Sequence, residues 1–160
     1  MATQTVQRSV PLWFIDGLAR IHVAGEETDG RYSVLEILGP EGDMPPLHVH
    51  HEEDEVFHVV DGEVTFFLPG KEVSLGAGET FRAPQGVPHT YRVESSSARW
   101  LVFCAPARFD DFVRAVSEPA PAEDLPPRGR PFDPELFAAE AAQRGIELLG
   151  PPGTLPEDQS

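Results

Sequence analysis

Apolar and polar residues alternate in short runs along the first two thirds of the chain, with turn-forming residues between the runs. Residues 31–38 are rich in β-forming side chains, and residues 55–60 alternate so that every second side chain shares a face. Further strand-like runs cover residues 18–23, 47–50, 63–68, 72–75, 79–83, 89–94 and 98–105. Many short strands joined by tight turns predict an all-β fold, an antiparallel β-barrel of the jelly-roll type.

The last third of the chain carries helical patterns instead. Apolar residues recur at helical spacing within residues 110–117. After a proline-rich stretch, Asp133 followed by Pro134 is typical of a helix start. This second helix is expected to reach residue 143 or 144 before Gly145 ends it.

The chain length of 160 residues suits a single domain with a sizeable core. We expect the barrel to occupy residues 1–106, and residues 107–160 to form a helical extension of the same domain. The extension is expected to pack on the outside of the barrel as short helices. A lid over the barrel mouth is the alternative role for it.

Charge and cysteine content narrow the range of partners. The net charge of −15 argues against nucleic acid and anionic membranes as partners. The single cysteine, Cys104, excludes an intrachain disulfide and is expected to be buried. Residues 1–8 lack a signal-peptide core and no apolar run is long enough to span a membrane, so a cytoplasmic location is expected.

Three histidines and one glutamate carry the candidate chemistry. His48 and His50 are two residues apart on one strand and therefore point to the same face. Glu55 opens the next strand, and His89 follows a turn rich in proline and glycine. Ligands from three strands converge only inside a curled sheet, such as a small barrel. Three imidazoles and a carboxylate suit one divalent transition metal per chain, Fe, Ni, Mn, Co, Cu or Zn, and do not suit Mg or Ca.

The stretches around these residues resemble the two signature motifs of the cupin family. The first motif is matched at every fixed position, by Gly42, His48, His50, Glu55 and Gly62. The second is matched by Gly78, Pro84, Gly86 and His89, whereas Val93 stands where the family motif has asparagine. The resemblance implies a jelly roll, or double-stranded β-helix, with His48, His50, Glu55 and His89 as the metal ligands.

The interior of the barrel is expected to be an apolar substrate pocket. The expected lining residues are Tyr32, Val34, Phe57, Val59, Tyr91 and Val93. Tyr32 and Val34 line the pocket only if the strand over residues 31–38 has the expected register. An apolar wall suits an aromatic or polyketide-like substrate better than a sugar or a small acid. The alternative for each of these residues is ordinary core packing.

Residues 46–63 and the tail after the barrel are similar to small single-domain cupins related to quercetin dioxygenases. The resemblance implies O2-dependent cleavage of an aromatic, flavonol-like or enolic small molecule, with Glu55 as the catalytic base. A homodimer is expected, because the edge strands of a short jelly roll invite pairing. Two alternatives stay open: a non-oxidative metal cupin, such as a polyketide cyclase or isomerase, and a non-catalytic cupin that binds a small molecule.

Overall fold

The computed structural model describes residues 8–159. Residues 1–7, which belong to the segment expected to lack a signal-peptide core, and residue 160 lie outside the described residues. Within the described part of the chain, no helix is long and apolar enough to cross a membrane.

The larger β layer is one antiparallel sheet, which has seven strands among residues 8–159. In spatial order these are β11 (Glu118–Pro119), β1 (Leu12–Phe14), β2 (Gly17–Val23), β3 (Ser33–Pro40), β10 (Ser97–Ala105), β5 (Asp54–Asp61) and β8 (Thr80–Ala83). Burial alternates along β10, so that its inward face, with Cys104 at its end, is buried. The predicted burial of Cys104 is therefore confirmed.

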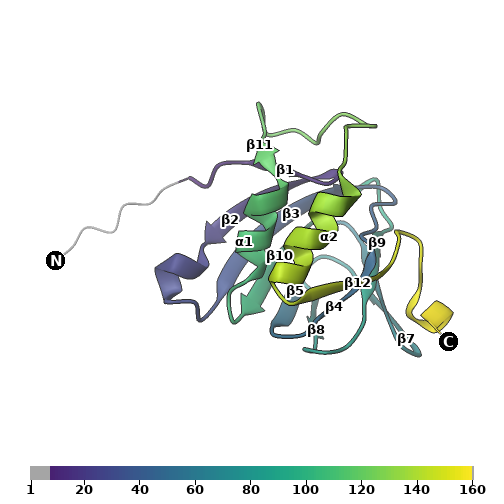
Figure 1. The fold of residues 1–160 in the computed structure, drawn as a ribbon. Coiled ribbons are helices and arrows are strands. Elements are labelled where there is room, and N and C mark those ends of the chain that lie inside the picture. Colours follow the sequence, from purple (N-terminus) through teal and green to yellow (C-terminus); the bar gives the residue numbers. More distant parts are fainter. Residues whose placement is uncertain (1–7, 160) are drawn as a thin grey trace.

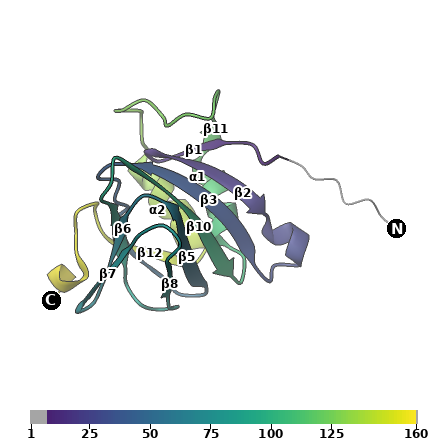
Figure 2. The same cartoon turned by 180° about the vertical axis from the view of Figure 1, so that it is seen from behind.

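The second layer consists of two small antiparallel groups of strands. The first contains β7 (Lys71–Leu75), β6 (Val64–Leu68) and β9 (Thr90–Val93), and the second pairs β12 (Ile146–Gly150) with β4 (Leu47–His50). An isolated antiparallel bridge between His48 and His89 links the two groups. The strands of the second layer lie beside the larger sheet (Figures 1 and 2). Side chains of both layers, including Leu35 of β3 and Phe66 of β6, belong to one hydrophobic core.

Two short α-helices follow the last long strand, close to where the sequence predicts them. They are α1 (Phe109–Val116) and α2 (Pro134–Gln143), and both lie against the β layers (Figure 1). Asp133 caps α2 by accepting hydrogen bonds from the backbone N–H groups of Glu135 and Leu136, at 3.1 and 3.0 Å. Single 3₁₀ turns occur at η1 (Gly25–Thr28) and η2 (Pro156–Gln159). The predicted antiparallel β fold with short C-terminal helices is confirmed.

The strands that the sequence analysis did not predict are all short and depend on distant partners. β1 and β11 pair with each other, and β12 pairs with β4. In the β12–β4 register, Ile146 lies opposite His50 and Leu148 opposite His48. The C-terminal segment is therefore built into the wall beside the candidate metal ligands. The division at residue 106 stays a prediction.

Candidate metal centre

The four predicted ligands converge in the described structure. One potential ligand atom from each of His48, His50, Glu55 and His89 lies within 4.8 Å of the other three. His50, Glu55 and His89 are almost fully buried. The cluster is compact enough for all four side chains to hold a single ion.

Backbone pairing fixes the relative positions of the histidines. His48 and His89 exchange backbone hydrogen bonds of 3.2 and 2.9 Å, and the Gly86 N–H donates to the His50 carbonyl at 2.8 Å. Gly86 has a φ of 77°, a conformation that favours glycine, so the turn before His89 depends on it. β4 and the turn before β9 are thus held side by side.

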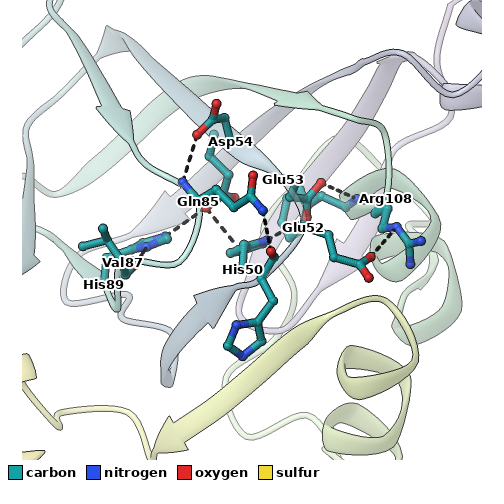
Figure 3. Close-up of polar contacts among 11 residues, drawn as sticks. His50, Glu52, Glu53, Asp54, Gln85, Val87, His89 and Arg108 are labelled. Carbon is teal, nitrogen blue, oxygen red and sulfur yellow. Dashed lines mark hydrogen bonds and ion pairs between the residues drawn. The ribbon is translucent and has the colours of Figure 1, made fainter.

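The loop before His89 is tied to the turn between β4 and β5 by Gln85. Its backbone N–H donates to Asp54 Oδ1 at 2.9 Å, and its side-chain Nε2 donates to the His51 carbonyl at 2.6 Å (Figure 3). His51 itself is exposed and lies 2.7 Å from Glu147, outside the cluster. These contacts hold Glu55, the second residue of β5, next to the histidines of β4.

Each imidazole is oriented through its Nδ1 atom. Nδ1 lies 2.7 Å from the Pro46 carbonyl in His48 and 3.1 Å from the Val87 carbonyl in His89. A carbonyl oxygen can only accept a hydrogen bond, so Nδ1 carries the proton in both rings. The Nε2 lone pairs therefore remain free to coordinate a metal.

Glu53 orients His50 in the same way, a role that was not predicted from the sequence. Nδ1 of His50 lies 2.6 Å from Glu53 Oε1, while Glu53 Oε2 accepts a 3.3 Å hydrogen bond from the Phe109 N–H at the start of α1. Glu53 is only 1% exposed. It lies in the polar run 51–54 between two strands, where side chains are commonly exposed to solvent. The available signal was its position three residues after a ligand, from which a carboxylate can reach back to the ring.

Polar atoms aimed into the cluster lack hydrogen-bond partners. Among the described residues, His50 Nε2, Glu55 Oε2 and His89 Nε2 are buried without one. Glu55 Oε2 lies 3.2 Å from His50 Nε2 and 2.9 Å from His89 Nε2, but neither pair has hydrogen-bond geometry. Buried polar groups are normally satisfied, so a shared partner between these atoms is expected. A divalent transition metal fits this donor set.

The charge states of two of the ligands, His48 and Glu55, also suit a cation. Burial, reinforced by the neighbouring His89 and His50, lowers the pKa of His48 to about 3, so its imidazole is neutral near pH 7. Burial raises the pKa of Glu55, but its interactions with His50 and His89 outweigh burial and lower it to about 2. A neutral imidazole and an ionised carboxylate are the forms that bind metal.

The ligands open onto a cavity of about 50 Å³, which we call the inner cavity. Two of the predicted pocket residues, Phe57 and Tyr91, line it. Most of the remaining wall is apolar and includes Ile37, Trp100 and Val102. The chemistry of the wall agrees with the expected apolar pocket.

The other predicted pocket residues do not line the inner cavity. Val59 and Val93 are buried in the core, at 0% and 1% exposure. Val34 lies on the outward face of β3, whose buried face carries Leu35 and Ile37. The register expected for this strand is therefore wrong.

Tyr32 also lies away from the inner cavity, beside the same strand. Its ring stacks on Phe103 of β10 at a centroid distance of 5.3 Å, and neither ring lines the cavity. Glu36 shares the outward face with Val34. Its charge was the sequence signal that this face points to solvent.

The C-terminal segment supplies much of the cavity wall, which the sequence analysis did not specify. The lining residues from this segment are Phe109, Phe112, Phe137, Ile146 and Leu148. The rings of Phe112 and Phe137 contact each other edge-on at 5.1 Å. The extension thus packs against the β layers and also closes one side of the inner cavity.

Comparisons with known proteins agree with this geometry. Residues 34–104 match the family described as Cupin domain. These residues form a cupin domain. Over 128 residues, or 79% of the chain, the sequence is 31% identical to quercetin 2,3-dioxygenase of Bacillus subtilis (strain 168). The chain spans 38% of the length of that relative.

Solved structures share the cupin fold. A predicted oxalate decarboxylase from Thermotoga maritima aligns with a TM-score of 0.58 at 19% identity, covering 64% of this chain and 99% of the other. KdgF from Halomonas sp. aligns with a TM-score of 0.55 at 20% identity, covering 61% and 86%. At these identities the likeness shows the fold alone. The chain therefore contains a cupin domain, resembles quercetinase-like proteins and has a cluster that can hold one metal.

Proposed function

We propose that this cupin is a metal-dependent dioxygenase that cleaves an aromatic, flavonol-like or enolic small molecule with O2. The observation that carries the proposal is the set of buried, unpartnered ligand atoms on His50, Glu55 and His89, beside a mostly apolar cavity. Such a cavity favours a hydrophobic substrate whose few polar atoms meet the ligand cluster. The likeness to quercetin 2,3-dioxygenase supports the same substrate class.

The metal-holding residues are His48, His50, Glu55 and His89, and they act as three neutral nitrogens and one carboxylate. A bound divalent metal supplies Lewis acidity toward a hydroxyl or carbonyl oxygen of the substrate. Glu53, Pro46 and Val87 hold the imidazoles in the required orientation through Nδ1. The apolar wall excludes water, which strengthens electrostatic interactions within the cavity.

Glu55 is the proposed proton acceptor for an enolic hydroxyl. Beside the imidazoles its pKa is about 2, which makes the carboxylate a good ligand and a weak base. If the carboxylate moves away from His50 and His89, it loses the interactions that lower its pKa, while burial continues to raise it. Proton transfer is therefore coupled to a displacement of the Glu55 carboxylate within the inner cavity.

The proposal is tested by metal analysis followed by oxygen uptake. The purified protein is assayed for metal, reconstituted separately with Fe, Ni, Mn, Co, Cu and Zn, and mixed with quercetin in an oxygen electrode. About one metal per chain together with O2 consumption is expected for at least one ion. Metal binding with conversion of a substrate but no O2 uptake would contradict the dioxygenase and favour a cyclase or isomerase. Tight binding without product would favour a binding protein.

The homodimer and the cytoplasmic location stay predictions. We propose that two copies of the chain associate as a homodimer. Light scattering coupled to size-exclusion chromatography measures the mass of the protein in solution directly. A mass near 17.5 kDa, that of one chain, would contradict it.

A further inference from the structure

The outward face of the large sheet carries an apolar surface that the metal centre does not use. In the register of the three central strands, Phe103 of β10 lies directly between Val34 of β3 and Val56 of β5. Tyr32, just before β3, stacks on the ring of Phe103 at a centroid distance of 5.3 Å. Leu101, two residues before Phe103 on the same strand, faces the same way. We call these five residues the sheet patch.

The sheet patch is exposed, unlike the other face of the same strands. Phe103 is 39% exposed, whereas Trp100 and Val102, which face inward, are each 1% exposed. Both α-helices lie on the inward side, because Phe112 and Phe137 line the inner cavity together with Trp100 and Val102. The outward face of an antiparallel sheet is normally polar, so a contiguous apolar group there indicates a contact surface.

Charged side chains border the sheet patch in pairs of opposite sign. Glu36 of β3 accepts a 2.9 Å hydrogen bond from Arg99 of β10. Arg82 of β8 lies 3.4 Å from Asp54 of β5. These four residues together contribute no net charge, whereas the whole chain carries −15. The surroundings of the sheet patch are therefore balanced on a strongly acidic protein.

This balance restricts the partner. Both bordering arginines are engaged by carboxylates, so they do not favour an acidic partner. A basic partner is attracted to the acidic remainder of the chain instead. A second copy also carries −15, and it meets the least repulsion where the local charge is balanced and apolar side chains are exposed.

We propose that two copies of this chain associate face to face through the sheet patch, about a two-fold axis. The same residues of each copy then form the contact, as two-fold symmetry requires. The inference rests on the proposed homodimer, which it deepens by naming the surface. It differs from the edge pairing expected from the sequence, because the edge strands β8 and β11 have only four and two residues and offer few backbone hydrogen bonds.

Salt dependence tests the nature of the contact. Salt screens the repulsion between two copies of charge −15 and leaves the apolar contact in place. The dissociation constant of the dimer, measured by analytical ultracentrifugation, is therefore expected to fall several-fold between roughly 30 and roughly 300 mM NaCl. A dissociation constant that is unchanged or rises with salt would overturn an apolar contact between like-charged copies.

The position of the contact is tested by Phe103→Gln, with Phe132→Gln as its matched control. Phe132 is also an exposed ring, at 52%, but it precedes α2 and contacts Phe137 on the inward side of the sheet. One substitution changes both copies of a two-fold dimer, so Phe103→Gln is expected to weaken the dimer about 30-fold or more. Phe132→Gln should keep the dissociation constant of the parent protein.

A second variant, Val34→Thr, keeps the test decisive if Phe103→Gln does not fold. Threonine keeps the shape of valine and adds one hydroxyl to the sheet patch, which loses its contact with water in the dimer. The dimer should weaken about 5–10-fold. Circular dichroism and metal content should match those of the parent protein, because Val34 lines neither the inner cavity nor the ligand cluster.

The outcomes separate the surface from the dimer itself. A parent protein with the mass of one chain at every concentration overturns both. A parent dimer with equal dissociation constants in Phe103→Gln and Phe132→Gln overturns the sheet patch and leaves the homodimer standing. Weakening in Phe103→Gln and Val34→Thr, but not in Phe132→Gln, supports the sheet patch. All of these measurements are independent of oxygen uptake, so failure of the dioxygenase leaves them unchanged.

Discussion

Glu53 holds His50 through a 2.6 Å contact between a carboxylate oxygen and Nδ1, and both side chains are almost fully buried. The second oxygen of Glu53 accepts from the Phe109 N–H, so the same carboxylate joins a metal ligand to the start of α1. Burial raises the pKa of Glu53. For His50, burial lowers the pKa, but the carboxylates of Glu55 and Glu53 outweigh burial and raise it.

Glu53→Gln is expected to weaken metal binding about 10–100-fold, the usual effect of losing a group that orients a ligand. The amide keeps the shape of the side chain but removes the charge that favours an Nδ1–H tautomer in His50. Competition with a chromophoric chelator measures the affinity. Glu52→Gln is the control, because Glu52 is exposed and pairs with Arg108 at 2.8 Å instead (Figure 3). Equal metal affinities in the two variants would show that Glu53 does not orient His50 for metal binding.

The four metal ligands were predictable because their positions depend on local spacing. The alternation of a strand places His48 and His50 on one face, and the motif supplies Glu55 and His89. Glu53 was not predictable in the same way, because only the folded turn shows that its carboxylate points inward. Phe137 comes from a helix whose docking site is distant in sequence.

The register of β3 shows a different limit. Both faces of this strand carry apolar residues, so alternation alone leaves two registers open. Pairing with β2 and β10 selects the register in which Leu35 faces the core and Val34 faces outward. Glu36 was the one residue in the run that favoured this choice.

Glu55→Gln is expected to keep part of the metal affinity and to lose most of the turnover. An amide oxygen still coordinates a cation, but the amide cannot take a proton from a substrate hydroxyl at neutral pH. Metal content and initial oxygen uptake are measured on the same preparation, so that the rate is expressed per bound metal. A rate per metal equal to that of the parent protein would exclude Glu55 as the base.

Metal loading is expected to raise the melting temperature of the protein. A ligand that binds only the folded state at 100 times its Kd contributes about 2.7 kcal/mol, which for a domain of this size corresponds to roughly 5–10 °C. Scanning calorimetry with and without the metal measures the shift. His48→Ala should lose most of the shift, while His51→Ala should keep it, because His51 is exposed and pairs with Glu147. The same shift in both variants would place the metal elsewhere.

Asp43 should make the protein less stable as the pH rises. Burial, with a further contribution from Asp16, raises the pKa of Asp43 from 3.8 to about 7. An ideal Cβ on Gly39 would lie 2.7 Å from Asp43 Oδ2, so the carboxyl group is packed closely against β3. Between these two pKa values the folded state holds a proton that the unfolded state has lost. The free energy of unfolding therefore falls as the pH rises from about 4 to about 7 and then levels off.

Asp43→Asn removes this dependence, because the amide does not ionise. The interval between the two pKa values corresponds to at most about 4 kcal/mol, and partial exposure of the side chain to water reduces that figure. The stability gain over the parent protein should therefore be larger at pH 8 than at pH 5 in urea unfolding. Asp61→Asn, at the exposed end of β5, is the control and should give no such difference. A gain for Asp43→Asn that is independent of pH would mean that the carboxyl is already ionised at pH 5 in the folded protein.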